Sequence, residues 1–222
     1  MGKFLKYCGL SCLLFVLSMS MVQAQSTEGL FGSREFKSTE ISAFKKWSSL
    51  RVRHDNNLKF NRRNSVKSLY GKCRLSKNFK CVDQEWRDII ISLKNKSTET
   101  KLSTINRHLN QTAYITDLVN WQQKDYWATL KQFFNKDGDC EDYAIAKYYS
   151  LKELGIPADQ MRIVIVEDTN LNVAHAVLAV YLEDQIWILD NQISNIIAQD
   201  KIVHYTPLYS INENAWWLHK TS

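Results

Sequence analysis

The sequence predicts an α+β fold in which helices from the first part of the chain pack on a mainly antiparallel β-sheet. Apolar residues recur at helical spacing before residue 140, whereas short segments rich in β-branched residues follow residue 160. Aromatic residues make up 12% of the chain, and only 7 glycines and 2 prolines occur. This composition favours one packed domain of roughly 200 residues without long disordered segments.

The N-terminal residues 1–24 have the pattern of a secretory signal peptide. Lys3 and Lys6 precede a short apolar run, and Val22-Gln23-Ala24 matches a signal-peptidase site. The run is too short to cross a bilayer, although an uncleaved N-terminal anchor is the alternative. We therefore expect export and a single mature domain over residues 25–222.

The formal net charge is +6, and the excess lies mainly in the N-terminal half. An exported protein rarely meets nucleic acid, so we do not expect nucleic-acid binding. A solvated basic face, or contact with an acidic partner or a membrane surface, fits this charge better.

Cysteine usage singles out one thiol. Removal of the signal peptide leaves Cys73, Cys81 and Cys140. In an oxidising compartment Cys73 and Cys81 could close a small disulfide loop, which would leave Cys140 free. A buried, inert thiol is the alternative interpretation of any single cysteine.

The first half of the chain is expected to contain three helices. Helical spacing of apolar residues places them around residues 41–50, 86–93 and 102–109. Residues 26–40 are expected to be a polar lead-in, and residues 51–80 to be loops with short elements.

A better-defined helix is predicted to begin near Cys140. Asp137 or Asp139 can cap its N-terminus, and Gly155 with Pro157 can end it. Cys140 then lies in the first turn, at the positive end of the helix dipole. It also lies on a single apolar stripe that faces the protein body.

The C-terminal part supplies the predicted sheet. Leu182 and Gln185 flank a plausible two-residue turn, and with these two residues paired His175 lies diagonally across from Asp190 on the same face. A slip of one residue would place His175 and Asp190 on opposite faces. The predicted strands are residues 161–168, 175–182 and 185–192, and residues 216–218 form either a last strand or an exposed contact patch.

Cys140, His175 and Asp190 have the residue types of a nucleophile, a base and an orienting acid. If the helix packs on the hairpin, His175 can take the thiol proton and Asp190 can fix the tautomer of the imidazole. The surroundings of Cys140 raise a question, because Asp139, Glu141 and their neighbours disfavour a thiolate.

Four segments carry a resemblance to a known family: "GDCEDYAIAKYYSLKELGIP", "HAVLAVY", "LDN" and, upstream, "DYWATL". They resemble the bacterial transglutaminase-like cysteine proteinases, and among these the LapG-like periplasmic proteases, over roughly residues 80–195. The resemblance implies a papain-like, transglutaminase-like core. It also assigns Cys140 as nucleophile, His175 as base and Asp190 as orienting acid.

The same resemblance implies a calcium ion beside the nucleophile, bound through Asp139 and Glu141, with Asp142 as a third ligand. Ca²⁺ prefers carboxylate oxygens, and its charge would lower the cost of forming a thiolate. The alternative is that these acids only cap the helix and face solvent.

The implied function is that of a calcium-dependent periplasmic cysteine endopeptidase. Its expected substrate is a large surface adhesin, cleaved near its N-terminus at a di-alanine site, so that the adhesin is released and the biofilm disperses. The expected regulator is an inner-membrane receptor of the LapD type that senses cyclic-di-GMP. Two alternatives remain: a transglutaminase, amidase or acyltransferase on the same scaffold, or a non-catalytic module that binds the receptor.

Overall fold

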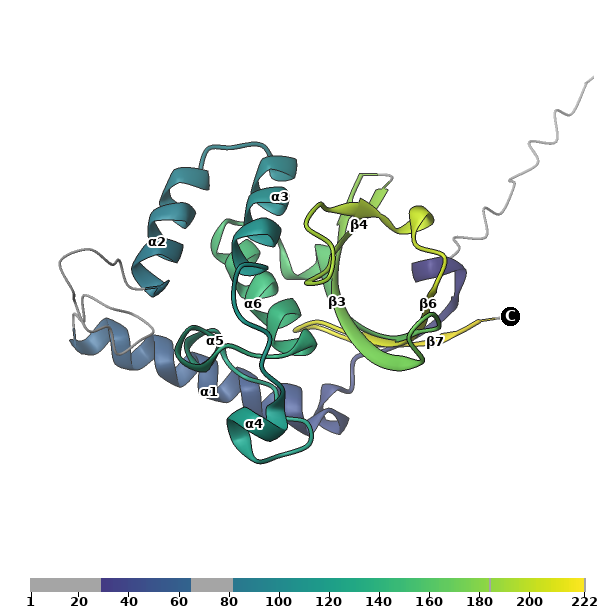
Figure 1. Ribbon diagram of the computed structural model, residues 1–222, viewed down its shortest axis with the longest axis horizontal. Coiled ribbons are helices and arrows are strands. Elements are labelled where there is room, and N and C mark those ends of the chain that lie inside the picture. The colour runs from purple at the N-terminus through teal and green to yellow at the C-terminus, as the bar shows by residue number, and fades with distance from the viewer. Residues whose placement is uncertain (1–28, 65–81, 184, 222) are drawn as a thin grey trace, which may run out of the picture.

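The structure is a computed structural model, and it describes residues 29–64, 82–183 and 185–221. The predicted signal peptide and the predicted Cys73–Cys81 disulfide lie outside these residues. Within them, the helices gather on one side of the molecule and a strongly curved sheet forms the other side (Figure 1). No helix among the described residues has the length and apolar character that a membrane span requires.

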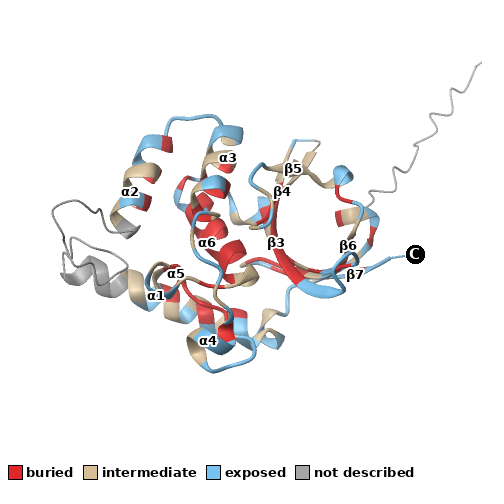
Figure 2. Ribbon diagram, viewed as in Figure 1, coloured by how far each residue is buried: buried red, intermediate tan, exposed pale blue. Residues whose placement is uncertain are grey.

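The helices surround α6, which begins at the candidate nucleophile. α6 is buried along its whole middle, from Asp142 to Leu151 (Figure 2). The predicted stripe is buried at Ala144, Tyr148 and Leu151, but the other faces of α6 are buried as well, because α3, α5 and the sheet all pack against it. The described helices are α1 (Lys45–Asn64), α2 (Val82–Leu93), α3 (Thr98–Leu109), α4 (Asp117–Trp121), α5 (Leu130–Lys136) and α6 (Cys140–Glu153).

Both predicted ends of α6 are confirmed. Asp139 occupies the N-cap position with an extended backbone, although its side chain makes no capping hydrogen bond. At the other end, Gly155 adopts a φ of 87°, which glycine tolerates best, and Pro157 follows. The thiol of Cys140 is thereby fixed to the first residue of a rigid, buried helix.

In the part of the chain that the structure describes, seven strands form one sheet in the order β1-β7-β6-β2-β3-β4-β5, and every pair is antiparallel. Hydrophobic residues cover both faces. Leu178 and Val180 pack with α6, whereas Val177 and Ala179 pack with Leu30 on the other face. The strands are β1 (Arg34–Ser38), β2 (Met161–Asp168), β3 (Val173–Leu182), β4 (Gln185–Leu189), β5 (Ile197–Ala198), β6 (Tyr205–Ile211) and β7 (Trp216–Lys220). The described residues also form four short 3₁₀ turns: η1 (Leu30–Gly32), η2 (Ile41–Ala43), η3 (Ala158–Gln160) and η4 (Gln199–Lys201).

Two N-terminal predictions are wrong. Residues 26–40 contain the edge strand β1, and the helix predicted over 41–50 begins at Lys45 and continues to Asn64. The stripe of Trp47 and Leu50 continues through a buried histidine, His54, which hides the apolar period in the sequence.

The C-terminal elements match the predictions more closely. β2 has the predicted limits, β3 begins two residues early, and β4 ends at Leu189, three residues before the predicted end. Trp216 to Leu218 form part of a strand, β7, which decides between the two alternatives for this segment.

Candidate active site

The early end of β4 makes room for the candidate nucleophile. β4 pairs with β3 only as far as Leu178. The part of β3 before Leu178 therefore has no neighbouring strand on that side. Here the Ala176 backbone N–H is directed at the sulfur of Cys140. The thiol therefore lies at the backbone of β3, next to the residue that follows His175, and is only partly exposed.

The predicted hairpin register is confirmed. Leu182 pairs with Gln185, and the Nε2 of His175 lies 2.9 Å from the Oδ1 of Asp190. Both side chains are buried, at 4% and 0% exposure. Because Asp190 contacts Nε2, Nδ1 is the ring nitrogen that remains for proton transfer.

Asp190 is held in its charged form by its contacts. Burial alone would raise the pKa of Asp190, but the hydrogen bond and charge of His175 lower it below the usual value. The Tyr205 hydroxyl donates to Oδ2 at 2.6 Å, and the Gln192 backbone N–H donates to Oδ1 at 2.9 Å. The sequence analysis did not identify Tyr205, because no local pattern links it to Asp190.

The thiol itself is in an environment that keeps it protonated. It donates to the Oε2 of Glu141 at 3.2 Å, and no hydrogen bond joins it to His175 among the described residues. Burial raises the pKa of Cys140, and the charges of Glu141 and Asp139 add to this effect, whereas the Ala176 N–H opposes it. Positive charge near these acids would therefore favour the thiolate.

Three acids beside the thiol share one pattern of hydrogen bonds. Asp117 accepts from the Tyr126 N–H, Asp139 from the Asp117 N–H at 3.1 Å, and Asp142 from the Ala128 N–H at 2.7 Å. Each of these contacts uses one carboxylate oxygen. The other oxygens, Oδ1 of Asp117, Oδ1 of Asp139 and Oδ2 of Asp142, are buried without a hydrogen-bond partner.

These three acids form a candidate cation site, since their ligand atoms lie within 4.8 Å of one another. A buried carboxylate oxygen without a donor is costly unless a cation binds it. Burial raises the pKa of Asp117 to about 6 and the pKa of Asp142 well above its usual value. The oxygen-only, acidic composition suits a calcium ion.

The structure separates the predicted calcium ligands into two groups. Asp139 and Asp142 lie together with Asp117, which the sequence analysis missed. Glu141 forms a second, overlapping group with Asp117 and Asp125. Burial, followed by the charge of Asp139, raises the pKa of Glu141 to about 8.

A short parallel contact brings Asp117 to the start of α6. Tyr114 bridges to Gly138, and the Ile115 N–H donates to the Gly138 carbonyl at 2.9 Å. A Cβ on Gly138 would lie 2.5 Å from both the Cβ and the Oδ2 of Asp142, so only glycine fits at this position. Such a tertiary contact between distant segments leaves no signal in local spacing.

The comparisons with known proteins agree with this geometry. The family model for the bacterial transglutaminase-like cysteine proteinase BTLCP matches residues 69–219, about two thirds of the chain. The chain belongs to the bacterial transglutaminase-like cysteine proteinases. The α+β fold of this proteinase and the predicted resemblance are thus confirmed. No curated protein sequence matches the chain.

Solved structures of LapG from Legionella pneumophila are similar to this proteinase. The calcium-bound LapG matches with 32% identity and a TM-score of 0.60, covering 75% of this chain and 88% of LapG. The EGTA-treated LapG matches with 36% identity and a TM-score of 0.57, covering 63% and 77%. A third LapG structure has 35% identity and a TM-score of 0.56, covering 62% and 77%.

Proposed function

We propose that this proteinase is a calcium-dependent cysteine endopeptidase with Cys140 as nucleophile, His175 as base and Asp190 as orienting acid. The hydrogen bond between His175 and Asp190, on the strand whose Ala176 N–H points at the Cys140 sulfur, carries the proposal. This pair supplies a base of fixed tautomer beside a thiol at a helix N-terminus.

In the proposed mechanism, Nδ1 of His175 takes the proton of Cys140, and the sulfur attacks a peptide carbonyl. The oxyanion that forms accepts from the Cys140 backbone N–H at the start of α6. His175 then returns the proton to the leaving amine as the C–N bond breaks. A water molecule, deprotonated by His175, hydrolyses the thioester and releases the second product and the free thiol.

Trp127 is a candidate for a second oxyanion donor, and a role in the core is the alternative. Its ring packs edge-on against Trp47, with centroids 6.2 Å apart, and it is 5% exposed. This packing favours the core role.

We propose that Asp117, Asp139 and Asp142 hold the calcium ion, with Glu141 nearby as a further ligand. Their unpartnered, buried oxygens support this assignment, and the calcium-bound LapG is a similar protein. Bound there, the ion would offset the acids that disfavour the thiolate and join residue 117 to the start of α6.

The similarity to LapG also supports a substrate and a location. We propose that the proteinase acts in the periplasm, after removal of residues 1–24. It cleaves a large surface adhesin near its N-terminus at a di-alanine site, which releases the adhesin and disperses the biofilm. An inner-membrane LapD-type receptor of cyclic-di-GMP binds and restrains it.

The deciding experiment is incubation of the proteinase with an N-terminal adhesin fragment that contains the di-alanine site. Mass spectrometry then reports the products with calcium and with a chelator. We expect two hydrolytic fragments with calcium and none with the chelator. Cross-linked or amine-modified fragments would indicate a transglutaminase or an acyltransferase instead.

The control variant is Cys140→Ala, which removes the thiol and keeps the helix. Cleavage should fall by a factor on the order of 10⁴ or more, as for other enzymes that lose their nucleophile. The melting temperature should stay close to that of the wild type. Undiminished cleavage by Cys140→Ala would rule out this mechanism.

A further inference from the structure

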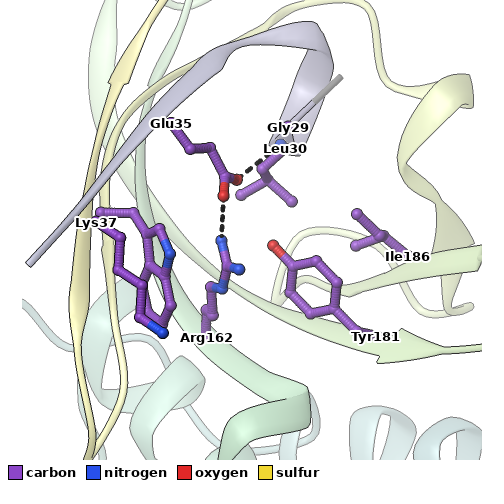
Figure 3. Close-up of a pocket in the computed structure, with 8 residues that line it drawn as sticks. Gly29, Leu30, Glu35, Lys37, Arg162, Tyr181 and Ile186 are labelled. Atoms are coloured by element: carbon purple, nitrogen blue, oxygen red, sulfur yellow. Dashed lines mark hydrogen bonds and ion pairs between the residues drawn. The ribbon is translucent and has the colours of Figure 1, made fainter. Parts of the chain in front are cut away.

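A second potential binding site lies on the concave face of the sheet. A cavity of about 460 Å³ opens there between η1, β1, β7 and the strands β2, β3 and β4 (Figure 3). Its volume is within the range of small-molecule sites. None of the residues that line it takes part in the proposed catalytic or calcium site.

Arg162 lines this cavity and is held in place by several contacts. Arg162 donates from Nη1 to the Oε2 of Glu35 at 2.8 Å, and the other oxygen of Glu35 accepts from the Leu30 N–H at 3.0 Å. The guanidinium lies 3.7 Å from the ring centroid of Trp217 and 4.5 Å from that of Tyr181. These contacts fix the direction of the arginine and occupy both oxygens of Glu35.

The cavity has more hydrogen-bond donors than acceptors. The Nε of Arg162 and the Oη of Tyr181 have no hydrogen-bond partner, and Figure 3 shows the Tyr181 hydroxyl directed towards Arg162. Lys37 is exposed, lies 5.6 Å from the Trp217 ring centroid, and forms no ion pair with another described residue. With two cationic side chains against the single carboxylate of Glu35, the cavity carries one positive charge in excess.

We propose that this cavity binds the carboxylate of a small ligand or of a bound peptide's acidic side chain. A carboxylate offers only acceptors and a single negative charge, which matches the surplus of donors and of charge. Leu30 and Ile186 line the cavity as well and would contact the apolar part of the ligand. A phosphate dianion would bring a second negative charge that nothing in the cavity offsets.

The exposure of the lining side chains predicts which of them a bound carboxylate contacts first. The Arg162 side chain is 14% exposed and Lys37 is open to solvent, so these two groups meet the carboxylate first. The Oη of Tyr181 is shielded from water and lacks a partner, so it would donate only to a carboxylate that enters the cavity fully. Lys37 should therefore contribute more to affinity than the Tyr181 hydroxyl.

The test is a titration of the isotope-labelled proteinase, followed by the amide signals of Tyr181 and Trp217 and the Nε–H signal of Arg162. The probes are butyrate, as a free carboxylate, and N-acetylglutamate methylamide, as an acidic peptide side chain. Their neutral counterparts are butyramide and N-acetylglutamine methylamide. We expect saturable shifts with the two acids, with Kd on the order of millimolar for fragments this small. The neutral amides should give none.

The two acidic probes identify the source of the carboxylate. Tighter binding of N-acetylglutamate methylamide assigns the cavity to an acidic peptide, and tighter or equal binding of butyrate assigns it to a free carboxylate. Inorganic phosphate at the same concentration should bind more weakly than either probe. Tighter binding of phosphate would overturn the assignment to carboxylates.

Three variants separate a real site from a general charge effect. Lys37→Gln should weaken binding about tenfold, because it removes a positive charge, and Tyr181→Phe about threefold, because it removes a donor. Lys220→Gln is the matched control, since Lys220 lies over the Phe36 ring and does not line the cavity. Equal affinity in all three variants, equal binding of the neutral amides, or no saturable shift would overturn the proposal.

Discussion

The acidic group beside Cys140 and the cavity on the concave face of the sheet have opposite imbalances of hydrogen-bond donors and acceptors. Around Cys140, the buried oxygens of Asp117, Asp139 and Asp142 lack donors. In the cavity, groups of Arg162 and Tyr181 lack acceptors. Buried polar groups are normally hydrogen-bonded, so each imbalance identifies the charge of the missing partner: a cation at the first place and an anion at the second.

The two regions also differ in how their charges are held. The acids lie on α4 and at the start of α6, which a single short bridge at Gly138 brings together. The cavity is framed by sheet strands and by the ion pair of Arg162 and Glu35. Removal of the ligand should therefore affect stability strongly at the acidic group and weakly at the cavity.

The largest expected effect is that of Asp142→Asn. The asparagine side chain keeps an oxygen that accepts from the Ala128 N–H. It loses the negative charge of the carboxylate, whose Oδ2 has no hydrogen-bond partner in the wild type. Calcium affinity, measured by calorimetry, should fall on the order of 100-fold. Asp137→Asn is the control, because it removes the same charge nearby from a residue outside both acidic groups. An equal loss in both variants would mean that general charge, and not ligation, holds the ion.

Gly138→Ala should have the next largest effect. The new Cβ would come within 2.5 Å of Asp142, and relief of this clash moves the carboxylate away from its partners. We expect calcium affinity to fall about tenfold and unfolding free energy to fall by about 1–3 kcal/mol. Calorimetry and denaturant unfolding measure the two quantities. Wild-type calcium affinity and unfolding free energy in Gly138→Ala would show that the close approach of Gly138 to Asp142 is not needed.

The raised pKa values of the acids beside Cys140 should be visible in the pH dependence of stability, measured in the presence of a chelator. The pKa of Asp117 is raised to about 6 and that of Glu141 to about 8, so the folded state binds protons that the unfolded state releases. The contribution of these two acids to stability should thus fall as the pH rises from about 4 to 8, and calcium should reduce this loss. Melting temperatures across this range test it. Because the lowered pKa values of His54 and His219 act in the opposite direction, the difference between the calcium and chelator curves is the readout. Parallel curves would contradict the raised pKa values.

Tyr205→Phe should have a moderate effect on catalysis. It removes the 2.6 Å hydrogen bond to Asp190, one of the contacts that keep this pKa low. We expect kcat to fall about fivefold with an unchanged KM and a shifted acidic limb of the pH profile. Tyr181→Phe makes the same chemical change at the cavity and should leave kcat unaltered. If both variants lose activity alike, Tyr205 has no special role in positioning Asp190.

The smallest expected effect is that of Lys37→Gln on catalysis. Lys37 lies on the edge strand β1, outside the proposed catalytic and calcium sites, so cleavage and calcium affinity should stay at wild-type values. A clear change in either would mean that the two regions are coupled through the sheet.

The sequence predicted those parts of the molecule that local patterns encode. The hairpin register follows from a two-residue turn and from alternation, and both placed His175 beside Asp190 correctly. The helix that starts at Cys140 and ends near Gly155 was predicted from capping residues. Among the described residues, these short-range features position the candidate triad.

The missed features depend on contacts between distant segments. Asp117 and Asp125 join the acidic residues around Cys140 through tertiary contacts, among them the Tyr114–Gly138 bridge and the hydrogen bond from the Asp117 N–H to Asp139. Tyr205 reaches Asp190 from β6, a strand that was not predicted. The far end of α1 was missed because a buried histidine, His54, stands in its apolar stripe.

The complete burial of α6 limits how this proteinase can diversify. From Asp142 to Leu151 every side chain contacts the interior, so a substitution there disturbs packing before it can alter substrate choice. Variation is better tolerated at exposed positions such as Val119 on α4, which is 73% exposed, and Leu171 before β3, which is 59% exposed. Exposed segments of this kind can change with the reactive sulfur left in place.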